Sequence, residues 1–270
     1  MNTIDLSNAT RISTEGHTSK GNQPKWLCGG TWYKADALGY EGLSEVLVSW
    51  MLSQSNVEGF VRYSPVIISD GESHRTGCSS ANFRNEDEML VPFERIHRAY
   101  RGTGLAKALA GMSAEEAVRY TVEFIESVTG LEDVGIWLTT VLELDSFTLN
   151  EDRHTNNLAV IRNEKTGSFR LCPIFDNGLA FLSDCNDYPF EKDIYSGMAS
   201  VRAKPFDRDF DVQVSAAEML YRPRLKFSFT KQYVRRELEL LEGYYTDEIL
   251  QRVETLVYEQ MRRYPVLFQA

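Results

Sequence analysis

The chain has 270 residues, of which 43% are hydrophobic and 25% charged, and its net charge is −10 with a pI near 5.0. This length allows one large domain or two lobes with a sizeable core. The acidic balance disfavours non-specific binding to nucleic acid or to an anionic membrane surface, so we expect neither as a partner.

The amino-terminal residues MNTIDLSNATRIS contain no apolar stretch of the kind that a secretory signal needs. No segment approaches the 18 apolar residues of a membrane span. The four cysteines show no metal-binding spacing, which favours reduced, packed thiols. These features together predict a cytoplasmic protein.

Residues 1–95 are rich in turn-forming glycine and in short β-prone segments. Strands are expected at residues 25–27, 31–34, 66–68 and 89–91. One helix interrupts them from Leu43 onward, because apolar side chains recur there at helical spacing. These apolar positions are Leu43, Val46, Leu47, Trp50 and Met51.

From about residue 96 the pattern is mainly helical. Ser113 and Glu116 form a capping box, which predicts a helix that begins there and ends near Gly130. A second helix is expected at about residues 132–144 and leads into an acidic loop. A short β-branched strand, residues 158–161, follows that loop. The carboxy-terminal residues from about Thr230 are expected to form amphipathic surface helices.

These elements predict an α+β, bilobal fold. A small β-rich N-lobe would comprise residues 1–95, and a larger, mainly helical C-lobe would comprise residues 96–270. Ligands often bind where two lobes meet, so we expect a ligand site at this junction.

The order of Asp152, Asn157 and Asp176 in the sequence indicates a catalytic function. Asn157 follows Asp152 by five residues, and Asp176 comes after a hairpin-length gap. Protein kinases use this order: the first Asp accepts the proton of the acceptor hydroxyl, and the Asn and second Asp hold magnesium. Because two turns flank one short strand, both loops would reach the same end of a ribbon. A polar loop with solvated carboxylates is the alternative interpretation.

Lys34 is the candidate for contact with the phosphates of ATP. It ends the segment Thr31–Lys34, and Glu45 follows eleven residues later on the predicted helix. Glu45 could pair with this lysine, although Glu41 is an equally available partner. A solvated lysine on an edge strand is the alternative.

The segment GHTSKGNQPKW, residues 16–26, is a candidate phosphate-binding loop. Gly16 and Gly21 permit positive φ angles, so successive backbone N–H groups could face anionic oxygens. A solvated turn is the alternative, and the two glycines alone favour it. In the acidic loop we assign proton acceptance to Asp152 and a structural role to His154. Arg153 could stack or could hold that loop by ion pairing, and we assign it no catalytic role.

The segments from Asn150 to Asn157 and from Phe175 to Gly178 resemble the HipA-like serine/threonine kinases, and most closely their short, single-module members of the CtkA type. The segment from Ser19 to Lys25 is similar to the Gly-x-Gln-x-Lys loop of that family. The segment from Gly77 to Phe83 resembles the region that precedes the hinge. The resemblance covers most of residues 16–185.

The resemblance implies a protein-kinase-like fold, ATP and Mg2+ as cofactors, and a protein substrate that the sequence does not identify. Asp152 would be the catalytic base, while Asn157 and Asp176 would bind magnesium. The residues implied to bind ATP are Ser19, Gly21, Asn22, Gln23, Lys34 and Glu45, with adenine near residues 89–93. Thr18 and Ser19 would be sites of autophosphorylation. An inhibitory partner protein would also be compatible with this family.

Three rival functions remain open at this point. A phosphoinositide-type lipid kinase also uses an Asp-Arg-His-x-x-Asn motif, but the chain shows no polybasic lipid patch. A pseudokinase would bind nucleotide or a protein without chemistry, yet all the acidic residues and Lys34 are retained. A metal-dependent hydrolase would need neither Lys34 nor the phosphate-binding loop.

Overall fold

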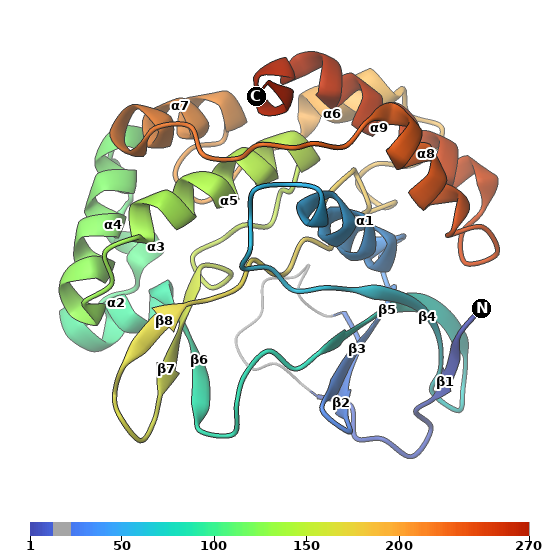
Figure 1. The fold of residues 1–270 in the computed structure, drawn as a ribbon, viewed down its shortest axis with the longest axis horizontal. Coiled ribbons are helices and arrows are strands. Elements are labelled where there is room, and N and C mark those ends of the chain that lie inside the picture. The colour runs from blue at the N-terminus through green and yellow to red at the C-terminus, as the bar shows by residue number, and fades with distance from the viewer. Residues whose placement is uncertain (13–22, 270) are drawn as a thin grey trace. The chain divides into compact units, whose positions relative to one another are not determined.

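The computed structural model describes residues 1–12 and 23–269 (Figure 1). The chain divides into two compact units. Unit 1 comprises Met1–Asn82, Asp176–Ser200 and Lys226–Ala270, and unit 2 comprises Phe83–Phe175 and Val201–Leu225. Each unit is therefore built from stretches that are separate in the sequence. The predicted boundary between an N-lobe and a C-lobe at residues 95 and 96 is a different kind of division, and it stays a prediction.

Unit 1 contains a five-stranded sheet in the order β1-β4-β5-β3-β2. Its strands are β1 (Thr3–Asp5), β2 (Lys25–Cys28), β3 (Thr31–Ala35), β4 (Ser64–Ser69) and β5 (His74–Ala81). β1 pairs in parallel with β4, and the other pairs are antiparallel. Leu6, Trp26 and Val66 belong to the hydrophobic cluster of this sheet. The predicted strands β2, β3 and β4 are confirmed, whereas β1 and β5 were not predicted.

Helix α1 (Glu41–Ser53) packs against this sheet, which confirms the predicted helix (Figure 1). A Cβ atom on Gly42 would lie 2.6 Å from the carbonyl carbon of Gly77 in β5. Such a distance is too short for a side chain, so the two glycines let the helix start close to the sheet. The other helices of unit 1 are α6 (Ile194–Ser200), α8 (Lys231–Glu239), α9 (Asp247–Arg263) and the 3-10 helix Pro265–Phe268. α8 and α9 confirm the predicted carboxy-terminal helices.

Unit 2 contains an antiparallel sheet in the order β6-β7-β8. Its strands are β6 (Glu88–Pro92), β7 (Ala159–Asn163) and β8 (Phe169–Leu171). Ala159, Ile161 and Cys172 form its buried cluster. The predicted ribbon after the acidic loop is confirmed, with its first strand one residue later than expected.

The helices of unit 2 are α2 (Phe93–Arg101), α3 (Leu105–Ala108), α4 (Ala114–Thr129), α5 (Val134–Thr148) and α7 (Phe210–Tyr221). The capping box of Ser113 and Glu116 is present at the start of α4, and Gly130 ends the helix at φ 72°. α7 packs against α4 and α5 (Figure 1). Within the described part of the chain, no helix has both the length and the apolar character that crossing a membrane requires.

Candidate functional site

Lys34 in unit 1 is held between two carboxylates. Its Nζ lies 2.5 Å from Oε1 of Glu45 and 2.9 Å from Oδ1 of Asp176. Strand β3 supplies the lysine and α1 supplies Glu45, whose carboxylate is fully buried. The approach of α1 to the sheet at Gly42, one turn before Glu45, brings the two side chains together.

Glu41 has a different function in the same helix. Its carboxylate accepts the backbone N–H groups of Ala37, Leu38 and Gly39 at 3.1, 2.8 and 3.0 Å. It therefore holds the loop before α1 against the first turn of the helix. The choice between Glu41 and Glu45 as partner of Lys34 is thus resolved in favour of Glu45.

The surroundings of Lys34 keep its ammonium charged. Burial acts to lower the pKa of Lys34, but the carboxylates of Asp176 and Glu45 outweigh it and hold the pKa well above its ordinary value. The ring of Tyr63 lies 5.4 Å from Nζ and adds a cation–π contact. Glu45 also accepts the backbone N–H of Asn177 at 2.9 Å, which fixes the chain just after Asp176.

Lys25 gives unit 1 a second cation near the first. It lies opposite Lys34 in the β2–β3 register, so both side chains are on one face of the sheet. Burial lowers the pKa of Lys25, and the positive charge of Lys34 lowers it further. The negative charge of Asp176 acts in the opposite direction. Gln23 precedes β2, and its buried Nε2 has no hydrogen-bond partner among the described residues. The predicted positions Thr18, Ser19, Gly21 and Asn22 lie outside the described residues.

Asp36, two residues after Lys34, is a buried carboxyl group in unit 1. It accepts hydrogen bonds from the amide of Gly42 at 2.5 Å, the hydroxyl of Thr76 at 2.8 Å and the hydroxyl of Tyr245 at 2.9 Å. Burial, reinforced by the nearby charge of Glu41, raises the pKa of Asp36 to about 7. This group therefore ties β3, α1, β5 and the carboxy-terminal segment together.

The acidic loop of unit 2 follows α5 through Leu149, which has a φ of 57°. Arg153 is buried within it and binds the buried carboxylate of Asp145 through Nε at 2.9 Å and Nη2 at 3.0 Å. Asn150 donates to the same carboxylate at 2.8 Å. Nη1 of Arg153 also donates to the carbonyl of Phe175, which directly precedes Asp176. Arg153 therefore holds the loop by ion pairing, which is one of the two roles that the sequence left open.

Asp152 lies in this loop with its side chain largely buried. Its Oδ1 lies 3.1 Å from Nζ of Lys204, which also belongs to unit 2. His154 Nε2 lies 3.7 Å from Oδ2, too far for a hydrogen bond. Sequence reasoning missed Lys204, because it is 52 residues from Asp152 and belongs to no local motif.

Asn157 is fixed in an orientation that suits a metal ligand. Its Nδ2 donates to the backbone carbonyl of Asp152 at 2.9 Å, so the amide turns its donor inward. Its Oδ1 has no hydrogen-bond partner among the described residues. Asp176, in unit 1, adopts a φ of 61°. Amide and carboxylate oxygens are the ligands that Mg2+ prefers, so both side chains fit that ion.

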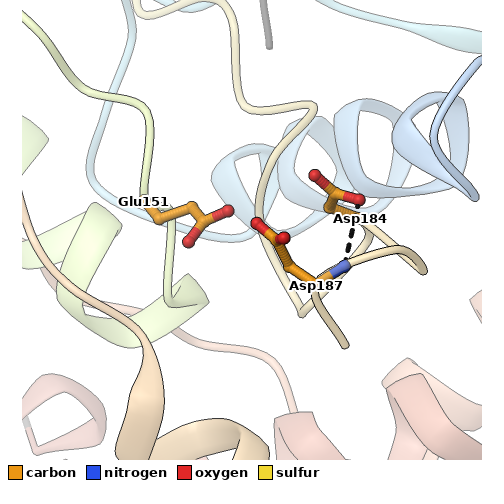
Figure 2. A group of neighbouring side chains, drawn as sticks. All are labelled: Glu151, Asp184 and Asp187. Atoms are coloured by element: carbon orange, nitrogen blue, oxygen red, sulfur yellow. Dashed lines mark hydrogen bonds between the residues drawn. The ribbon is translucent and has the colours of Figure 1, made fainter. Parts of the chain in front are cut away.

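Asp184 and Asp187 follow Asp176 in unit 1 (Figure 2). Asp184 Oδ1 accepts the backbone N–H groups of Asn186 at 3.0 Å and Asp187 at 3.4 Å. These bonds make Asp184 a cap for its own turn. Glu151, also drawn in Figure 2, belongs to unit 2.

Comparison with known proteins identifies the fold. The sequence matches no protein-family model and no curated protein. A solved structure, that of the proinflammatory kinase CtkA of Helicobacter pylori, is similar to the chain. The TM-score is 0.66, and the match covers 98% of this chain and 96% of the kinase at 13% sequence identity. The chain has the fold of this kinase.

This likeness confirms the predicted α+β, bilobal, kinase-like fold class and the resemblance to CtkA. The roles of individual residues stay predictions. Within unit 1 the structure brings together Lys34, Glu45 and Asp176, and within unit 2 it brings together Asp152, His154 and Asn157.

Proposed function

We propose that the chain is an ATP- and Mg2+-dependent protein kinase that transfers the γ-phosphoryl group to serine or threonine hydroxyls. The observation that carries the proposal is the contact of Lys34 with both Glu45 and Asp176 in a chain that has the fold of a kinase. An ion pair between a β-strand lysine and a helix glutamate, next to a metal-binding aspartate, is a requirement of phosphoryl transfer in protein kinases.

Lys34 would bind phosphate oxygens of ATP. Glu45 orients the ammonium, and the phosphate oxygens replace Asp176 as its second partner. Asp176 and Asn157 would then hold Mg2+, which neutralises the developing charge on the phosphates. Lys25, on the same face as Lys34, adds positive charge for the same anion.

Asp152 would act as the general base. Its carboxylate accepts the proton of the acceptor hydroxyl while that oxygen bonds to the γ-phosphorus. The bond between the γ-phosphorus and the bridging oxygen breaks, and ADP leaves. Arg153 keeps this loop in place through Asp145 and the carbonyl of Phe175.

The protein substrate, a cytoplasmic location and the autophosphorylation of Thr18 and Ser19 belong to this proposal. A phosphate on either residue adds roughly −1.5 to −2 charge at neutral pH, so it should inhibit ATP binding. Intact-mass and peptide mass spectrometry after incubation with ATP and magnesium tests this point, with Asp152→Asn as control. Unmodified Thr18 and Ser19 in active enzyme would remove autophosphorylation from the proposal.

The test of the function is transfer of phosphate from ATP to a generic protein acceptor and to phosphoinositide vesicles. Asp152→Asn should keep ATP binding and lose turnover by about a hundredfold or more. Asp176→Ala should lose turnover and weaken binding of ATP with magnesium. Binding without transfer would indicate a pseudokinase, and transfer to lipid alone a lipid kinase. Phosphate release without any acceptor would indicate a hydrolase.

A further inference from the structure

The two oxygens of the Asp152 carboxylate are in different surroundings. Oδ1 is bound by Lys204 at 3.1 Å, whereas Oδ2 has Nε2 of His154 at 3.7 Å and no hydrogen-bond partner among the described residues. We propose that Lys204 is a positioning residue: it holds Oδ1 so that Oδ2 takes the proton of the acceptor hydroxyl. This inference rests on the proposed kinase function.

The chain around Lys204 is anchored on both sides. The amide of Ala203 donates to the carbonyl of Arg208 at 2.9 Å, and Ala203 and Phe206 are buried. The Lys204 side chain itself is 44% exposed, so its position depends on the backbone and on Asp152. The anchored backbone and the ion pair with Asp152 together place the ammonium at Oδ1.

The loop around Asp152 is equally constrained. The Asp152 amide donates to Oδ1 of Asn150 at 3.3 Å, and its carbonyl accepts the amide of His154 at 2.8 Å and Nδ2 of Asn157 at 2.9 Å. The backbone of Asp152 is therefore fixed, and rotation of its carboxylate is the remaining freedom. Lys204 restrains that rotation.

In the transfer step, a lone pair on Oδ2 takes the hydroxyl proton, so Asp152 becomes a neutral acid. The acceptor oxygen bonds to the γ-phosphorus, and the bond to the ADP oxygen breaks. Lys204 keeps its three protons throughout. Misplacing a base by about 1 Å can lower the rate on the order of a hundredfold, so holding this oxygen in place should favour catalysis.

Kinetics of the full chain test this role. Lys204→Ala should lower kcat by roughly ten- to a hundredfold and change KM for ATP by less than about twofold. Lys204→Arg keeps a positive donor and should restore most of kcat. Arg208→Ala is the matched control, because it removes one positive charge from an exposed position in the same segment. Its kcat should equal that of the wild type.

A double-mutant cycle separates action through Asp152 from direct action on phosphate. In the Asp152→Asn background, Lys204→Ala should change the residual rate by less than about twofold. A wild-type kcat in Lys204→Ala, or an undiminished loss in the Asp152→Asn background, would overturn the inference. Failure of the proposed function looks different, because then the wild type itself transfers no phosphate or Asp152→Asn transfers it at the wild-type rate.

Discussion

Loss of either partner of the buried pair of Arg153 and Asp145 should strongly destabilise unit 2, because the other charge would then be buried without a partner. Their side chains are 2% and 0% exposed, and two bonds of 2.9 and 3.0 Å join them. Asp145→Leu removes the carboxylate that neutralises a buried guanidinium. Arg153→Met removes the cation that neutralises a buried carboxylate. Breaking a buried pair from one side costs about 3–5 kcal/mol, so each variant should lose that much free energy of unfolding.

The double variant Asp145→Leu with Arg153→Met leaves neither charge buried. Its loss should be smaller than either single loss, with a coupling energy on the order of 3 kcal/mol or more. The matched control is the exposed pair of Arg119 and Glu115, whose atoms lie at 2.6 Å but whose side chains are about half exposed. Because solvent screens an exposed pair, Glu115→Ala should cost less than about 1 kcal/mol.

Urea unfolding followed by circular dichroism measures all of these variants. A loss below about 1 kcal/mol in both single variants would refute the reasoning, since the pair would then behave like one at the surface. Additive losses in the double variant would refute it as well.

Three further predictions concern unit 1. Gly42→Ala should lower the free energy of unfolding by about 1–3 kcal/mol in thermal unfolding, despite better helix propensity, because its Cβ would overlap Gly77; a more stable variant would contradict the close packing. Asp36→Asn should gain stability over the wild type by up to about 1.4 kcal/mol per pH unit from pH 5 to 7. Between these pH values the folded wild type keeps a proton on Asp36 that the unfolded chain has lost, so the stability of the wild type falls as the pH rises towards 7. A difference in free energy of unfolding between variant and wild type that does not change with pH in urea unfolding would contradict this assignment. Lys34→Ala should weaken ATP binding in isothermal titration and Lys34→Arg should restore it only in part, because a planar guanidinium does not replace a compact ammonium; unchanged affinity and turnover would make Lys34 a structural residue.

Local patterns predicted the elements that depend on neighbouring residues. The capping box of Ser113 and Glu116 fixes the start of α4 through contacts three residues apart. β2 and β3 lie at the strands expected at residues 25–27 and 31–34, and Gly29 and Gly30, both with positive φ, form the turn between them. In such cases the sequence contains the whole interaction, so the prediction needs no tertiary information.

Contacts between distant residues account for what the sequence did not predict. Lys204 reaches Asp152 across 52 residues, and no spacing rule connects them. Strand β5 contains Gly77 and polar side chains, and its pairing with β3 and β4 rather than its composition makes it a strand. Glu41 and Glu45 share a helix face, and only the approach of α1 to the sheet selects Glu45 as partner of Lys34.

The most direct test of the proposed function is which phosphate of ATP reaches the acceptor. The wild type and Asp152→Asn would be incubated with magnesium, a generic protein acceptor, and ATP labelled at either the γ- or the α-phosphate. A kinase predicts label on the protein from γ-labelled ATP only, and loss of that label in Asp152→Asn. Label from α-labelled ATP, or equal γ-label in both proteins, would contradict phosphoryl transfer by Asp152.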